Sequence, residues 1–68
     1  MLCPRCDFQG EIRKVKIRKT KEHVQLCDEC DALWKELDEV TKSNFIDFST
    51  YVAQFGLRGT WDEIDEVR

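Results

Sequence analysis

Cys3-Pro4-Arg5-Cys6 and Cys27-Asp28-Glu29-Cys30 are two C-x2-C knuckles, and the twenty residues from 7 to 26 separate them. Within each knuckle two thiolates can face one ion, while backbone N–H groups of the tight turn point at the sulfurs. Four sulfurs then close the tetrahedral shell that Zn2+ prefers, at Zn–S distances of about 2.3 Å. The spacing therefore predicts one structural zinc per chain, with Cys3, Cys6, Cys27 and Cys30 as its ligands.

Two other interpretations of the cysteines stay open. Four cysteines allow three disulfide pairings, and small domains often carry disulfides. Residues 1 to 20 lack the apolar segment of a secretory signal, which favours reduced thiolates and a cytoplasmic location. An iron centre of rubredoxin type would use the same ligands. Glycine often follows the second cysteine of a knuckle; here Asp7 and Asp31 do, and Asp tolerates the left-handed conformation better than most residues.

Length and charge restrict the possibilities further. In a chain of 68 residues, which we expect to form a single domain, a hydrophobic core alone supplies only about 3 to 5 kcal/mol, so a bound metal would add needed stability. The net charge of -3 is unevenly spread, since residues 1 to 30 hold seven Lys/Arg and five Asp/Glu, whereas residues 31 to 68 hold four and nine. The first part is thus +2 and the second -5. No stretch approaches the roughly 18 apolar residues of a membrane span.

The residues between the knuckles predict a β-hairpin. Apolar and charged residues alternate over 11 to 19, with a bulge near Arg13, and again over 23 to 26. The turn lies at residues 20 to 22, so each strand carries one knuckle at the open end of the hairpin. We expect a zinc ribbon over residues 1 to 31, whose buried face consists of Val15, Ile17, Val24 and Leu26.

After the second knuckle the apolar spacing changes to three and four residues, which predicts helices. The first would span 32 to 42, where Leu33, Trp34, Leu37 and Val40 form the apolar side and Trp34 packs beside the metal. A second would span 44 to 55 and a third 61 to 67. The predicted fold class is α+β, a small zinc ribbon followed by two or three short helices.

The knuckles and the segment Leu26-Cys27-Asp28-Glu29-Cys30-Asp31-Ala32-Leu33-Trp34 resemble small bacterial zinc ribbons named after the B-type general transcription factor. The chain is also similar to the N-terminal zinc domains of certain bacterial antitoxins, which bind and block a toxin. The resemblance covers residues 2 to 40. It implies only the four cysteines as ligands, and the hairpin tip lacks the adjacent Asp-Glu pair of transcript-cleavage ribbons.

No combination of residues predicts catalysis, because the cysteines are taken by the metal and the one histidine has no paired nucleophile. The preferred hypothesis is a non-catalytic protein-binding module, an immunity or antitoxin-type inhibitor of a basic toxin such as a nuclease. Large aromatic residues near acids in the second half suggest its surface. The expected partner-binding residues are Asp47, Phe48, Tyr51, Phe55, Trp61, Asp62, Glu63, Asp65 and Glu66.

The alternative hypothesis is a nucleic-acid-binding or transcription-associated ribbon. Six cations fall within nine residues of the hairpin, enough to contact several phosphates. They are Arg13, Lys14, Lys16, Arg18, Lys19 and Lys21. No aromatic residue lies among them, which argues against stacking on single-stranded bases.

Overall fold

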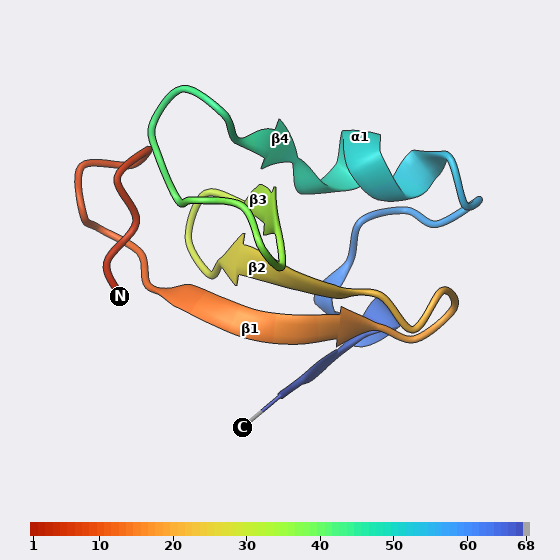
Figure 1. Ribbon diagram of the computed structural model, residues 1–68. Helices are drawn as coiled ribbons and strands as arrows, with labels where there is room; N and C mark the ends of the chain where they lie inside the picture. Colours follow the sequence, from red (N-terminus) through yellow and green to blue (C-terminus); the bar gives the residue numbers. More distant parts are fainter. Residues whose placement is uncertain (68) are drawn as a thin grey trace.

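A five-stranded antiparallel sheet forms the centre of the computed structural model, which describes residues 1–67 (Figure 1). Arg68, the last residue of the predicted domain, lies outside the described residues. The strands follow the order β4-β3-β2-β1-β5 across the sheet. The elements are β1 (Ile12–Ile17), β2 (His23–Cys27), β3 (Ala32–Lys35), β4 (Ile46–Asp47), α1 (Phe48–Ala53), a 3-10 turn (Trp61–Glu63) and β5 (Ile64–Glu66).

The predicted hairpin is present as β1 and β2. Its register runs without interruption from Ile12 opposite Cys27 to Lys16 opposite His23, so the bulge expected near Arg13 does not occur. The four residues expected on its buried face, Val15, Ile17, Val24 and Leu26, are all at most 1% exposed. Both knuckles lie at the end of the hairpin away from its turn, as Figure 1 shows.

The predicted α+β class is wrong, because the residues after the second knuckle extend the sheet. Residues 32 to 35 form β3, which pairs with β2 and β4, instead of starting a helix. Ala32, Leu33 and Trp34 are all buried because both faces of this strand are covered, and a strand covered on both faces reads as an unbroken apolar run. The helical spacing had included Leu37, yet Leu37 is 94% exposed in the turn that follows.

The other two expected helices are shortened or absent. Helix α1 covers only Phe48–Ala53, and Asp47 caps it by accepting a hydrogen bond from the Thr50 N–H. The third expected helix, 61 to 67, is a single 3-10 turn followed by β5. Strand β5 pairs with the outer edge of β1 and places Ile64 opposite Ile17. That apolar pair, together with the hydrogen bonds along β1, outweighs the helical preference of a short acidic segment.

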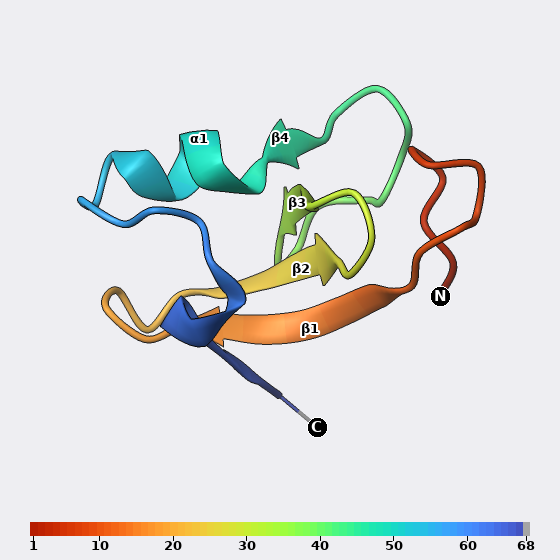
Figure 2. The same ribbon diagram turned by 180° about the vertical axis from the view of Figure 1, so that it is seen from behind.

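Two apolar clusters lie around the sheet. The larger contains the buried hairpin face, Leu33, Ile64 and two helix residues, Phe48 and Val52. The smaller contains Cys3, Cys27, Ala32 and Trp34. Figure 2 shows α1 and β4 on one side of the hairpin, and the knuckles lie beside the smaller cluster. The prediction that Trp34 packs beside the metal ligands is confirmed.

Candidate metal centre

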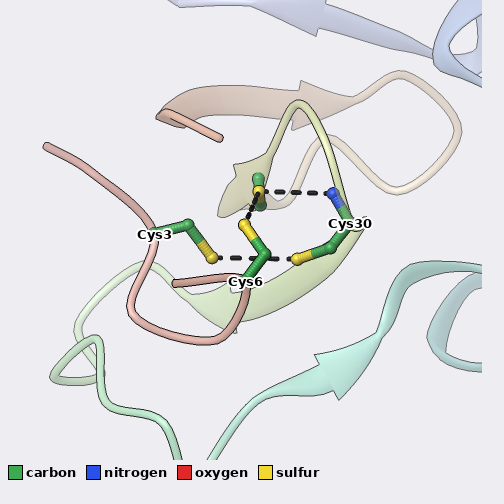
Figure 3. A group of neighbouring side chains, drawn as sticks. Cys3, Cys6 and Cys30 are labelled. Atoms are coloured by element: carbon green, nitrogen blue, oxygen red, sulfur yellow. Dashed lines mark hydrogen bonds between the residues drawn. The ribbon is translucent and has the colours of Figure 1, made fainter. Parts of the chain in front are cut away.

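The four cysteine sulfurs converge on one point at the open end of the hairpin. Cys3 and Cys6 come from the N-terminal loop, Cys27 ends β2, and Cys30 lies in the turn before β3. All four sulfurs lie within 4.8 Å of one another. Figure 3 shows the side chains of Cys3, Cys6 and Cys30 pointing toward a common centre. Residues far apart in the chain thus form one cluster that could hold a metal ion.

The spacing of the sulfurs tests which ligand fits. A regular tetrahedron with a centre-to-sulfur distance of about 2.3 Å has edges of about 3.8 Å. Of the six Sγ–Sγ distances, that between Cys3 and Cys30 is 3.7 Å and that between Cys6 and Cys27 is 3.8 Å, and all lie within 4.8 Å. A disulfide needs about 2.05 Å, and all four cysteines are free. The cluster therefore has the dimensions of a four-thiolate metal site and not those of two disulfides.

Backbone geometry holds the sulfurs in place. The Gly10 N–H donates to the sulfur of Cys6 at 3.3 Å, and the N–H groups of Glu29 and Cys30 donate to that of Cys27 at 3.4 Å. Both knuckles turn through left-handed residues, Asp7 with φ of 55° and Asp31 with φ of 58°. Asp thus does here what glycine often does in such knuckles.

Gly10 is required for a different reason. A Cβ atom at this position would lie 2.5 Å from Cys27 Sγ and 2.6 Å from Glu29 Cβ. The N-terminal loop therefore approaches the second knuckle so closely that only glycine fits without displacing a ligand. Close packing against a ligand sulfur is thus what requires glycine at position 10.

The cysteines differ in their acidity. Burial raises the pKa of Cys3 and raises that of Cys27 to about 12. Burial also acts to raise the pKa of Cys30, but hydrogen bonds from the Ala32 N–H and the Arg5 guanidinium together lower it to about 7. Metal ligation requires thiolates, so binding of an ion would displace protons from the buried pair.

Arg5 is a site residue that the sequence analysis missed. Its guanidinium lies beside Cys30, which raises the pKa of Arg5, and it stacks 4.6 Å from the centre of the Phe45 ring. A cation here offsets the negative charge of four thiolates. The position of Arg5 inside the knuckle was visible in the sequence. Its partner Phe45 was not, because the two are forty residues apart.

The aromatic residues expected to bind a partner are mostly part of the fold. Phe48 is 0% exposed, so its place among the surface anchors is wrong and it belongs to the core. Tyr51, Phe55 and Trp61 are half-buried against the larger cluster. The Tyr51 hydroxyl donates to Glu22 at 2.5 Å, and burial, followed by this bond, raises the pKa of Tyr51 to about 12.

Most of the acids expected at the same surface also have partners within the chain. Asp47 caps α1, and hydrogen bonds from Ser49 and Thr50 lower its pKa. Glu63 accepts from the N–H groups of residues 58, 59 and 60. Asp65 binds Arg18 at 2.9 Å. Asp62, which accepts from the Thr60 hydroxyl, and Glu66 are exposed.

Half of the hairpin cations are engaged within the chain too. Arg13 pairs with Asp28 at 3.3 Å, Arg18 pairs with Asp65, and the Lys19 ammonium donates to the Phe55 carbonyl at 2.6 Å. The remaining three are Lys14, Lys16 and Lys21, and Lys16 lies opposite Asp65 in the β1–β5 register. The folded hairpin therefore presents a weaker positive charge than the number of cations in its sequence indicates.

No protein-family model, no curated protein and no solved structure matches this chain. Within residues 1–67, no helix is long and apolar enough to cross a membrane.

Proposed function

We propose that the four cysteines bind one zinc ion, and that this zinc is structural. The observation that carries this proposal is the closed cluster of four sulfurs with Sγ–Sγ distances of 3.7 and 3.8 Å. Four thiolates fill a tetrahedral shell and leave no position for a bound water or a substrate. The metal would join the N-terminal loop to the end of β2 and the start of β3, and so stabilise the centre of the sheet.

Metal analysis tests this first proposal. Protein purified under reducing conditions should contain one zinc per chain, and a strong chelator should remove the metal and unfold the protein, since folding and zinc binding are coupled in such small domains. Iron in place of zinc, or an unchanged circular dichroism spectrum after complete zinc removal, would contradict it.

We further propose that the module is non-catalytic and binds a basic protein, and that it acts as an immunity or antitoxin-type inhibitor of a toxin such as a nuclease. A nuclease presents a cationic surface to its substrate, and an acidic protein is attracted to such a surface. The pairing of Arg13, Arg18 and Lys19 within the chain favours a protein partner over the nucleic-acid alternative, because paired cations release fewer counterions from phosphates.

A recovery and inhibition experiment distinguishes the two hypotheses. The zinc-loaded protein, used as bait in the cell that encodes it, should recover a basic enzyme whose activity falls to zero at a one-to-one ratio. If the bait retains only nucleic acid, and Lys14→Glu with Lys16→Glu abolishes that retention, the nucleic-acid hypothesis is correct instead. Both lysines lie on β1 without a hydrogen-bond partner for their ammonium groups among the described contacts. Because Lys16→Glu places a second acid opposite Asp65, the melting temperature of the double variant is measured beside its retention of nucleic acid.

A further inference from the structure

Exposed apolar side chains gather at the metal end of the molecule. Met1, Leu2 and Phe8 are 69%, 56% and 62% exposed, and they are three of the five large apolar residues that stand out from the described surface. Backbone contacts hold them around the first knuckle, because Leu2 bridges to Glu11 and the Phe8 N–H donates to the Cys3 carbonyl at 2.9 Å. We call Leu2, Phe8 and the neighbouring acids Asp7, Glu11 and Glu29 the metal-end patch.

Phe8 is held in a conformation that a bulky residue rarely adopts. Its φ is 63° and follows the left-handed Asp7, an arrangement that costs of order 1 to 3 kcal/mol for a residue other than glycine. The knuckle enforces it through the Phe8 N–H bond to Cys3 and the Gln9 N–H bond to Cys6 at 3.1 Å. The backbone at Phe8 is thus held by the knuckle and the side chain is 62% exposed to solvent, although glycine would fit the backbone better.

The charge around these side chains is strongly acidic. Residues 1 to 13 and 27 to 31 hold five Asp/Glu, against two Arg and the α-ammonium group of Met1. One of these arginines, Arg13, is paired with Asp28, and the other, Arg5, lies beside Cys30. A zinc ion with four thiolates adds a formal charge of about -2. The metal end is therefore acidic, although the first thirty residues as a whole are basic.

We propose that the metal-end patch is the docking surface for the basic protein partner, with Phe8 and Leu2 as apolar anchors and the acids as the charged rim. This inference rests on the proposed function above and moves its working surface away from the C-terminal residues. Charge complementarity selects the occupant: a cationic surface around an apolar pocket matches the patch. A second copy of the chain is a poor match, since two acidic ends and two anionic centres would face each other.

Site-specific crosslinking tests the location. A photoreactive phenylalanine derivative is placed at position 8, at position 55 in the predicted C-terminal surface, or at position 37. Leu37 is the matched control, because it is 94% exposed and flanked by Glu36 and Asp38 but lies outside the patch. We expect position 8 alone to crosslink to a basic protein, and the product to disappear in about 1 M salt, where the screening length is about 3 Å.

Each other outcome overturns the inference in a recognisable way. A product from position 55 alone retains the proposed function and refutes the metal-end location. Equal products from positions 8 and 37 indicate unspecific attraction, and a crosslink to a second copy indicates self-association. Either result refutes the inference. Nucleic acid as the only product, or no product at any position, refutes the proposed function as well.

A pair of substitutions separates binding from folding once the partner is identified by crosslinking. Phe8→Gly should raise the melting temperature, because glycine adopts positive φ without strain, and should weaken binding about tenfold or more, because the anchor is lost. Leu37→Ala should change neither. An unchanged affinity of Phe8→Gly would refute the role of Phe8 as an anchor, whatever its effect on stability.

Discussion

The close approach of Gly10 to the second knuckle leads to a sharp prediction for Gly10→Ala. The new Cβ would lie 2.5 Å from Cys27 Sγ, whereas non-bonded heavy atoms prefer about 3.5 to 4.0 Å. The loop or the ligand must therefore move by about 1 Å, which spoils a tetrahedron whose edges are about 3.8 Å. Overpacking of this kind costs about 1 to 3 kcal/mol, equivalent to a loss of about 5- to 150-fold in zinc affinity.

Gly56→Ala is the matched control, because it separates backbone strain from crowding. Gly56 has φ of +78°, and the nearest atom to an added Cβ is Lys19 Nζ at 3.6 Å. Alanine there costs roughly 1 to 2 kcal/mol of conformational energy at the end of α1, away from the sulfurs. Both variants thus lower stability, and only Gly10→Ala should alter the metal site itself.

The assay must report ligand geometry as well as affinity, because folding and metal binding are coupled. Chelator competition gives the zinc affinity, and the visible spectrum of the Co2+-substituted protein reports tetrahedral thiolate coordination. We expect a changed Co2+ spectrum for Gly10→Ala and a native spectrum for Gly56→Ala. Native affinity and a native spectrum for Gly10→Ala would refute the argument that this glycine is required by contact with a ligand.

Three further predictions address the rest of the fold. The pKa of Tyr51 is raised from 10 to about 12, so the folded state favours the neutral phenol. The resulting stabilisation is complete below pH 10 and is lost as the pH rises toward 12, which lowers the unfolding free energy by roughly 3 kcal/mol. Denaturant unfolding from pH 9 to 12 should show that loss in the native protein and not in Tyr51→Phe. Trp34→Phe should cost about 1 to 3 kcal/mol in urea unfolding, because the indole N–H donates to the Thr41 carbonyl and to Asn44 at 3.0 and 2.8 Å. Leu37→Asp should change the unfolding free energy by less than about 0.5 kcal/mol, as its exposure implies, whereas a loss above 2 kcal/mol would support the helix that the sequence had predicted.

The sequence allowed the metal cluster and the hairpin to be predicted because both depend on local patterns. Two knuckles of fixed spacing identify four ligands, and alternation over a few residues identifies strands that are buried on one face. The same local signals failed for β3. Leu33 packs into the larger apolar cluster on one face of the strand, and Ala32 and Trp34 pack into the smaller cluster on the other. Alternation of apolar and polar residues is therefore lost, and a short apolar run cannot be distinguished from a helix.

Strand β5 shows a second reason why sequence alone was insufficient. Residues 61 to 67 carry apolar positions at helical spacing and a good helix start, with Glu63 reaching the Thr60 N–H at 3.0 Å. The 3-10 turn at this start forms, but after one turn the chain becomes extended as β5, because the outer edge of β1 is available for pairing. Pairing with a distant strand is a tertiary gain that local preference does not report. The same limitation applies to Arg5 and Phe45, which meet only in the folded chain.

The distribution of charge on the folded molecule differs from its distribution along the sequence. The first thirty residues are basic and the remainder acidic, yet β5 brings Asp65 to Arg18 and Glu66 opposite Val15 on the hairpin. The acids of the second part therefore neutralise cations of the first, and both lose much of their ability to attract a partner. Asp7, Glu11 and Glu29 form none of the described ion pairs, although the hydrogen bond to Asp28 and then the nearby Glu11 raise the pKa of the Arg13 guanidinium. All three lie around a centre that becomes anionic when its thiolates bind zinc. If attraction to a basic partner guides this protein, the unneutralised charge of the metal end should govern it, so that Glu29→Lys slows association in low salt more than Asp65→Lys does.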